Sequence, residues 1–237
     1  MLDILAAAAI GATFAAFCGY GIASFQALFL NRTFGLTAGE AAVWINVPAA
    51  LAGSLGALAT GWLAGRLAHR YPNAIAWIPG FGMILSVPFY LLAFSTGNLV
   101  VCAVALCIAG FSKYGYLAAQ YTIGQGVVSA QVRAVSTAVM LFIINLLGYG
   151  LGPLFIGALS DTLFALQVAD LGAADLTRKA CEGAARAALS GDLQAICKIA
   201  HPESLQKSLW ITSLLYAGGG GFFLLTCRWL QKDMVAK

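Results

Sequence analysis

One lysine stands well inside an apolar run of the sequence, within residues 98–127. Lys113, Tyr116 and Gln120 are spaced by three and four residues, so in a helix they share one face. An ammonium group near the middle of a membrane costs at least about 2.5 kcal/mol unless it faces protein or water. This pattern predicts a polar stripe along a cavity, in which Lys113 binds an anionic substrate group or takes part in proton coupling. The alternative is a lysine that snorkels or is satisfied by backbone carbonyls.

Three side-chain amides also interrupt the apolar runs. An amide in such a position serves either as a hydrogen-bonding contact between helices or as a contact to substrate. The amides are those of Gln26, Asn46 and Asn145, and Tyr20 adds a polar group to the first run. The residues predicted to contact substrate are Lys113, Tyr116, Gln120, Tyr20, Gln26 and Asn145.

Composition and length predict the elements that carry these residues. Hydrophobic residues make up 61% of the 237 residues and charged residues 9%, and the mean hydropathy is +0.87. A soluble domain carries about 25% charged residues, so a soluble fold could not cover so much apolar surface. A membrane-spanning helix needs about 20 apolar residues, a length that six runs reach. We expect one all-α integral membrane domain over 1–237, with spans at about 4–30, 38–67, 74–94, 98–127, 132–160 and 209–230.

The distribution of Lys and Arg predicts the orientation. Residues 161–206 are polar, cannot cross a membrane, and are expected to hold short helices near 174–189. If the amino terminus lies inside, the short outer loops carry only Arg32, which predicts a multi-pass protein of the cell inner (plasma) membrane with both termini cytoplasmic and 161–206 outside. Since Arg32 is also the first base of the chain, we expect further sequence upstream. The cytoplasmic ends would hold Arg66, Arg70, Arg133, Arg228, Lys232 and Lys237.

The six cysteines fall into two groups. Four stand in apolar runs, where a small buried hydrophobic residue is the expected role. Cys181 and Cys197 share the polar segment, where a bridge would close a loop of about 15 residues and contribute roughly 3 kcal/mol in the chain-entropy model. We predict a disulfide between them, since an outside location permits one.

The connection between the second and third spans carries a motif. It reads Gly61-Trp-Leu63-Ala-Gly65-Arg66-Leu67-Ala68-His69-Arg70, and it resembles the loop signature of the major facilitator superfamily, roughly G-x-L-x-D-R-x-G-R-R. Gly61, Leu63, Arg66 and Arg70 match, which makes Gly61, Arg66 and Arg70 the candidate gating loop. Glycine replaces the acidic residue at position 65, so the acid of a charge-paired gate is missing. The alternative is a basic turn with no special role.

A second motif stands in the fifth span. The run from Gly148 to Gly157, which includes Gly152 and Pro153, resembles the glycine-rich G-x-x-x-G-P-x-x-G-G antiporter-type motif of the same superfamily, without its final Gly-Gly. Gly148 and Gly152 lie one turn apart and permit close helix approach, and Pro153 removes a backbone donor and bends the helix. Residues 130–161 are most similar to the spinster-like branch, and that resemblance extends over the chain as helices seven to twelve.

The sequence contains no pattern that favours catalysis. His69 and His201 lie in polar connections without metal-ligand spacing, and no phosphate loop or nucleophile elbow is present. The basic residues form no patch of the kind that binds nucleic acid. We expect no enzyme activity, no cofactor, no metal and no nucleic-acid partner.

The resemblance implies one six-helix half of the superfamily fold, built from two three-helix inverted repeats. It implies a twelve-helix carrier that works by alternating access. We predict a secondary active transporter of a small organic solute, present here as its carboxy-terminal half, with a substrate pathway lined by the first, fourth and fifth spans. Two alternatives stay open: a half-size carrier acting as a homodimer, and a non-transporting membrane scaffold or assembly protein. The expected partners are an anionic or amphipathic solute, the lipid bilayer, and either an amino-terminal half or a second copy.

Overall fold

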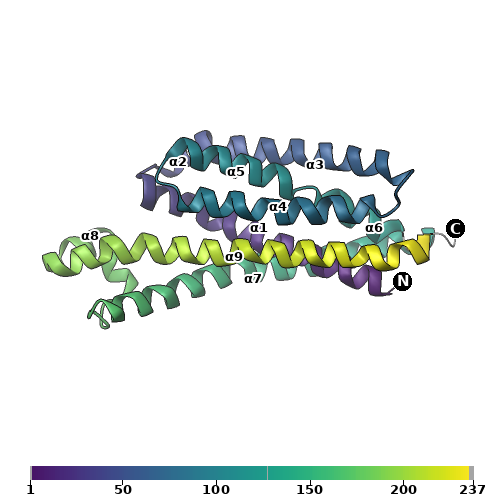
Figure 1. Cartoon of the computed structure of the whole chain (residues 1–237). Helices are drawn as coiled ribbons and strands as arrows, with labels where there is room; N and C mark the ends of the chain where they lie inside the picture. The colour runs from purple at the N-terminus through teal and green to yellow at the C-terminus, as the bar shows by residue number, and fades with distance from the viewer. Residues whose placement is uncertain (1, 127, 235–237) are drawn as a thin grey trace.

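The computed structural model describes residues 2–126 and 128–234, and every regular element in these ranges is helical. Six helical segments within these ranges are long and apolar enough to cross a membrane, which agrees with the number of spans predicted. Most of these segments run along the long axis of the molecule (Figure 1). The elements are α1 (Leu2–Phe34), α2 (Ala38–Ala41), the π-helical turn η1 (Ala42–Asn46), α3 (Val47–Ala68), α4 (Ala74–Ser95), α5 (Leu99–Lys113), α6 (Tyr116–Gly126), η2 (Ala130–Val132), α7 (Arg133–Asp170), η3 (Arg178–Cys181), α8 (Gly183–Ala187) and α9 (Gly191–Met234).

Local signals in the sequence explain where the second helical segment begins and where it changes geometry. Thr37 and Glu40 form a reciprocal capping box in which the Thr37 amide donates to the Glu40 carboxylate at 2.9 Å. Pro48 cannot donate a hydrogen bond to the preceding turn, and the five residues before Val47 adopt π-helical geometry. The irregular turn brings Asn46 to the start of α3, next to the central cavity described below.

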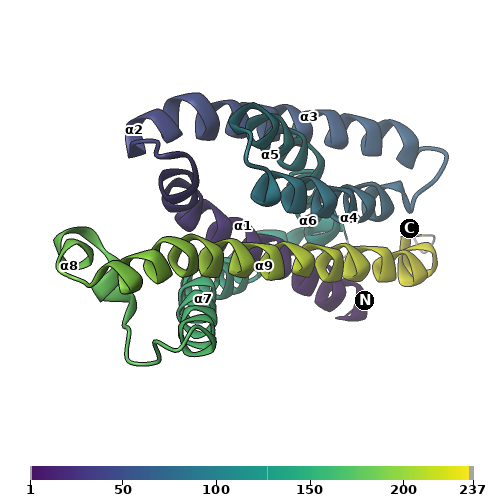
Figure 2. The same cartoon turned by 60° about the vertical axis from the view of Figure 1, so that its left-hand side comes forward.

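Neighbouring helices form a continuous series of contacts. α3 packs on α5, α5 on α4, α4 on α9, α9 on α1, and α1 on α7 (Figures 1 and 2). The buried core follows this series and is built from alanine, leucine, isoleucine and aromatic side chains. α3 and α7 therefore stand at the two ends of this series, with α5, α4, α9 and α1 between them.

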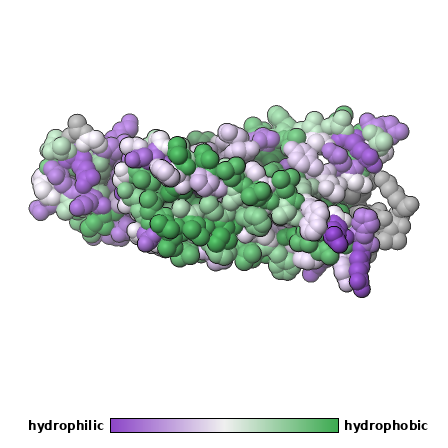
Figure 3. Space-filling model, turned by 90° about the horizontal axis from the view of Figure 1, so that it is seen from above, coloured by the Kyte–Doolittle hydropathy of each residue, from purple (hydrophilic) through white to green (hydrophobic). Residues whose placement is uncertain are grey.

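The exposed surface is apolar over most of its length. Figure 3 shows a broad hydrophobic belt between two ends where hydrophilic residues gather. Such a belt is expected for helices surrounded by lipid or by further membrane helices. The exposed apolar side chains of α3 and its preceding turn include Val43, Trp44, Leu51, Leu55, Leu58 and Trp62, and those of α7 include Val135, Val139, Phe142, Leu146 and Leu154.

Two glycines of α7 face α1 at close range. A Cβ atom built on Gly148 would lie 2.7 Å from the Cβ of Ala16, and one built on Gly152 would overlap the carbonyl oxygen of Phe17. Pro153 is accommodated within a helix that continues to Asp170. The small residues thus let the α1 and α7 backbones touch directly.

The polar segment predicted over 161–206 is largely helical rather than a loop. α7 continues past the apolar run to Asp170 and α9 begins at Gly191, which leaves only residues 171–190 between them. Apolar composition marks where a membrane span ends, but a helix can continue in water when its polar residues pair. Lys207 and Glu203, one turn apart on α9, form such a pair at 3.3 Å.

The extensions of α7 and α9, with η3 and α8, form a small subdomain that we call the distal cap, residues 161–203. It lies at the end of the molecule opposite both termini (Figure 1). It has a hydrophobic cluster of its own, and a disulfide joins Cys181 and Cys197, whose Cα atoms are 5.3 Å apart. The buried members of the cluster are Phe164, Val168, Leu176, Cys181, Cys197 and Ala200.

We predict that Gly152→Ala lowers the stability of the bundle, because the added methyl group must displace the α1 backbone. Overpacking of this kind costs about 1–3 kcal/mol. Gly150→Ala is the matched control, since a Cβ at that position meets nothing within 4 Å. Thermal unfolding of the purified chain in detergent measures both, and equal melting temperatures for the two variants would contradict the close α1–α7 contact.

We also predict that denatured, unreduced protein reacts with four equivalents of a thiol reagent and that reduced protein reacts with six. Cys18, Cys102, Cys107 and Cys227 are free, whereas Cys181 and Cys197 are bridged. Mass spectrometry after alkylation counts the labels. Six labels without reductant would show that the bridge does not form.

Candidate functional site

Lys113 lies at a break between two helices. α5 ends at Lys113 and α6 begins at Tyr116, with a turn at Tyr114 and Gly115 between them. A Cβ atom at residue 115 would overlap the side chain of Thr60 on α3, so only glycine lets the turn approach α3 this closely. The predicted span over 98–127 is therefore two helices. The spacing predicts that Lys113, Tyr116 and Gln120 share one helix face. The break between α5 and α6 interrupts that face after Lys113.

Three tyrosine rings surround the Lys113 ammonium group. Its Nζ donates a hydrogen bond to the hydroxyl of Tyr216 at 3.0 Å, and it lies 5.4 Å, 4.8 Å and 5.3 Å from the ring centroids of Tyr90, Tyr114 and Tyr216. The rings of Tyr90 and Tyr216 stack on each other. Aromatic faces stabilise a cation, and the effect grows when water is excluded. Lys113 is only 6% exposed, so these contacts hold a charge that is almost completely buried.

The charge of Lys113 has no acidic partner in the part of the chain that the structure describes. The ion pairs in that part all involve other residues, and all lie in or beside the distal cap. Tyrosine hydroxyls and rings are neutral, so they solvate the ammonium group without compensating its charge. A buried cation left in this way is a favourable site for an anion that enters from outside the chain.

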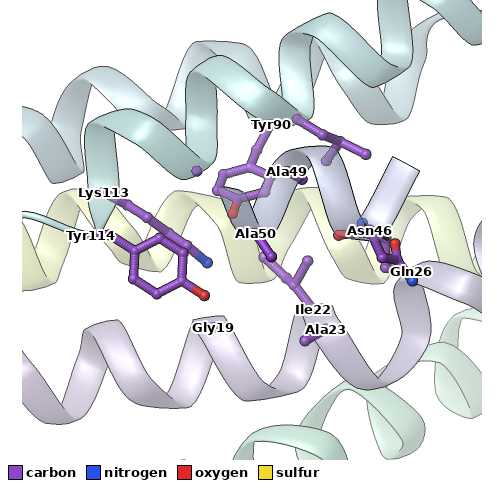
Figure 4. A pocket seen from close by; sticks show the side chains of 12 residues that line it. Gly19, Ile22, Ala23, Gln26, Asn46, Ala49, Ala50, Tyr90, Lys113 and Tyr114 are labelled. Atoms are coloured by element: carbon purple, nitrogen blue, oxygen red, sulfur yellow. Dashed lines mark hydrogen bonds between the residues drawn. The ribbon is translucent and has the colours of Figure 1, made fainter. Parts of the chain in front are cut away.

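A cavity of about 260 Å³ lies beside Lys113. Its walls come from α1, η1, α3, α4 and α5, and no residue of α7 lines it. Lys113 directs its ammonium group into the cavity from one side, and Gln26 and Asn46 face it from the other (Figure 4). The amide of Gln26 donates to Asn46 Oδ1 at 2.7 Å. The cavity thus combines one cationic group, an amide pair and two tyrosines with otherwise small or apolar walls.

The six residues predicted to contact substrate do not form one site. Lys113 and Gln26 line this cavity, but Tyr116 and Gln120 do not. Tyr116 and Gln120 are buried, and Gln120 Oε1 has no hydrogen-bond partner among the described residues. The helix break at Tyr114 and Gly115 explains this separation.

Tyr20 and Asn145 meet on another face of the molecule. The Tyr20 hydroxyl lies 3.5 Å from Asn145 Oδ1, and its ring lies 3.9 Å from that of Tyr149. Asn145 and Tyr149 are exposed. Since consecutive residues of a helix point about 100° apart, Gly19 can line the cavity while Tyr20 next to it turns toward α7.

Sequence reasoning missed two residues of the site, Tyr90 and Tyr216. Each lies within an apolar run, on α4 and α9, far from Lys113 in sequence. A signal for them did exist, because a buried tyrosine hydroxyl requires a polar partner and Lys113 was the one cation available inside a span. Which tyrosines meet Lys113 depends on how α4, α5 and α9 pack, and spacing does not reveal that.

The candidate gating loop lies at the end of α3 away from the distal cap. The guanidinium of Arg66 lies 5.5 Å from the ring of Trp62, and that of Arg70 lies 5.7 Å from the ring of Tyr71. Both arginines are exposed, and neither forms an ion pair within residues 2–126 and 128–234. Each arginine of this loop thus contacts an aromatic ring close to it in the sequence.

No family model matches the chain. It is 34% identical to an MFS-type efflux pump of Mycolicibacterium smegmatis over 168 residues, which cover 71% of this chain and 38% of the pump.

Two crystal structures of a bacterial homologue of the human lysosomal transporter Spinster also match. The inward-facing, unoccupied form is 33% identical with a TM-score of 0.87, and the match covers 97% of this chain and 48% of that chain. The inward-facing, occupied form is 32% identical with a TM-score of 0.86, and the match covers 98% of this chain and 50% of that chain. The chain therefore spans about half the length of the solved transporter it matches, and less than half of the efflux pump.

The chain has the fold of a multi-pass membrane protein: the described residues contain six helical segments able to span a membrane, and a buried cation lies beside a cavity between them. The chain belongs to the major facilitator superfamily, and its similarity to a Spinster homologue extends over nearly its whole length.

We predict that Tyr216→Phe destabilises the chain, because Lys113 loses its hydrogen-bond acceptor while the ring stays in place. Loss of a hydrogen bond to a buried charged group costs about 1.5–3 kcal/mol. Tyr114→Phe is the control, since its ring contacts Lys113 but its hydroxyl makes no hydrogen bond among the described residues. Thermal unfolding in detergent separates the two.

A double-mutant cycle then tests the pair directly. In a Lys113→Met background, Tyr216→Phe should have little effect. An effect of equal size in both backgrounds would show that the Tyr216 hydroxyl acts independently of Lys113.

Proposed function

We propose that this chain is the carboxy-terminal half of a secondary active transporter for a small organic anion, and that the cavity beside Lys113 is part of the substrate pathway. The observation that carries the proposal is a buried lysine that faces a cavity and has no carboxylate partner in the described chain. Burying a charge is costly, and membrane proteins retain ionisable groups at such positions chiefly for function. A structural role alone would be served as well by an apolar residue.

The chemistry of the cavity favours an organic anion over an inorganic one. Lys113 supplies a charge for a carboxylate or a similar group, and the Gln26–Asn46 pair offers donors and acceptors to a polar substituent. The remaining walls include Ile22, Leu106 and the ring of Tyr90, which suit an apolar body. Few polar groups among apolar walls is the usual composition of a small-molecule site.

The solved transporter that this chain matches is about twice as long, so the chain would supply half of the transport pathway. The exposed apolar faces of α3 and α7 are the surfaces that an amino-terminal half would cover. The exposed contact of Tyr20 with Asn145 and Tyr149 would then lie at the junction of the two halves. In this arrangement the Lys113 cavity opens toward the second half of the carrier.

The proposed orientation places both termini in the cytoplasm and the distal cap outside. The Arg66 and Arg70 end of α3 carries the positive charge expected of a cytoplasmic face. The disulfide in the distal cap is compatible with an oxidising exterior. The bilayer would then surround the hydrophobic belt seen in Figure 3.

We predict that Lys113→Gln and Lys113→Ala each reduce transport of organic anions at least about tenfold, because a charge-assisted contact of about 1.5–3 kcal/mol is lost. The measurement is gradient-driven uptake of a panel of radiolabelled carboxylates into membrane vesicles that contain this chain together with an amino-terminal half. Lys179→Gln is the control, since Lys179 is exposed in the distal cap.

Lys113→Arg should recover part of the activity if charge is what matters. Unchanged uptake in Lys113→Gln and Lys113→Ala, at equal protein levels, would overturn the assignment of Lys113. Equal uptake by vesicles that contain this chain alone would favour a half-size carrier over a half of a larger one.

A further inference from the structure

A second cavity, of about 610 Å³, lies in the distal cap where α1 ends. The cap closes over the last turns of α1, so the cavity wall combines α1 with η3, α8 and α9. The charged and titratable side chains that line the cavity are Arg32, Arg178, Arg186, Lys198, His201 and Glu182.

Existing ion pairs compensate only part of this charge. Glu182 Oε1 lies 3.3 Å from Arg32, 3.9 Å from Arg178 and 3.4 Å from His201 Nε2. Arg178 also pairs with Asp161 at the edge of the cap. Four permanent cations thus face two carboxylates, which leaves two positive charges in excess even with the histidine neutral.

The two remaining cations, Arg186 and Lys198, line the same cavity. Neither forms an ion pair or a side-chain hydrogen bond with another described residue. Meanwhile the side chain of Arg32 is only 8% exposed and that of Arg178 is 20% exposed, so water reaches these guanidinium groups poorly. Arg186 is half-buried and Lys198 is exposed, so the two unpaired cations can be reached from outside the cap, beside two guanidinium groups that are already paired. The fork of an arginine fits two oxygens of an oxyanion at once.

We propose that this cavity binds a dianionic oxyanion, with a phosphate group as the ligand that best matches the charge. Two negative charges would neutralise the excess, which one carboxylate would not. Arg186 and Lys198 would contact the oxyanion directly, and Arg32 would contribute from the inner wall while it keeps Glu182 as its partner. The phosphate belongs either to a soluble phosphate ester or to the headgroup of an anionic phospholipid at the membrane surface.

The disulfide holds this cavity together. Cys181 and Cys197 both line it, and their bond connects η3, which carries Arg178, to α9, which carries Lys198 and His201. Because η3 and α8 are short and have only the small cluster of the cap beneath them, the bond fixes the distance between cations that would otherwise repel. The site is therefore part of the folded, oxidised cap.

The test is thermal unfolding of the purified, unreduced chain in a zwitterionic detergent with inorganic phosphate at constant ionic strength. A ligand that binds only the folded state raises the melting temperature in proportion to its occupancy. We expect a saturable rise of a few degrees with phosphate and none when chloride replaces it. Arg186→Gln and Lys198→Gln should each weaken the apparent affinity at least about tenfold, by loss of a charge-assisted contact.

Lys179→Gln removes the same charge from an exposed position outside the cavity, and it should leave the phosphate response unchanged. Neither cavity variant breaks an ion pair described here, so both should fold, and their melting temperatures without phosphate show whether they do. No response in the unsubstituted chain, or equal responses in all three variants, would overturn the proposal.

A final comparison separates the two sources of phosphate. Glycerol phosphate and a short-chain phosphatidate are titrated at equal concentration, and the tighter of the two identifies a soluble ester or a lipid headgroup. None of these measurements involves transport or Lys113. The outcome of the phosphate test therefore does not depend on the transport function proposed above.

Discussion

Close approach of helix backbones is the constraint on which this bundle depends. The surface of an apolar chain gains little by turning from lipid to another helix, so packing between backbones must supply much of the association. Small residues provide it at three crossings. A Cβ on Gly80 of α4 would lie 3.0 Å from the carbonyl oxygen of Gly220 on α9, and one on Gly21 of α1 would lie 3.0 Å from that of Gly152 on α7. A Cβ on Gly56 of α3 would overlap the backbone of Phe111 on α5.

The same close packing explains how a lysine can be buried at the centre. α5 and α6 lie against α3 through Gly110 and Gly115, and the helix breaks between Lys113 and Tyr116. The break directs Lys113 toward α4 and α9, where Tyr90 and Tyr216 stack and receive it. The Lys113 ammonium group is therefore held by aromatic groups on helices that pack closely through glycine. Its other side faces the cavity and is available to a ligand.

The distal cap follows a different physical rule. It is too small to be stabilised by its hydrophobic cluster alone, and it adds a disulfide and a group of ion pairs around Glu182. Arg32 links this group to α1, which packs on both α7 and α9. The cap and the cavity beside Lys113 thus share one helix. A ligand bound in either place would meet α1, at Arg32 in the cap and at Gln26 within the bundle.

The amino-acid sequence by itself determined the class of the protein, because apolar runs of sufficient length leave few alternatives to membrane-spanning helices. It also indicated Lys113, since a charge in an apolar run is visible without a structure. It further predicted close helix approach at Gly148 and Gly152 and a disulfide between Cys181 and Cys197. Only the tertiary structure decided which side chains meet. Tyr90 and Tyr216 reach Lys113 from other helices, Tyr20 turns away toward Asn145, and the helices of the cap continue past their apolar runs. The physical reason is that hydrophobicity and spacing act along one helix, whereas a site is formed by the crossing of several, and the crossings depend on packing between residues far apart in sequence.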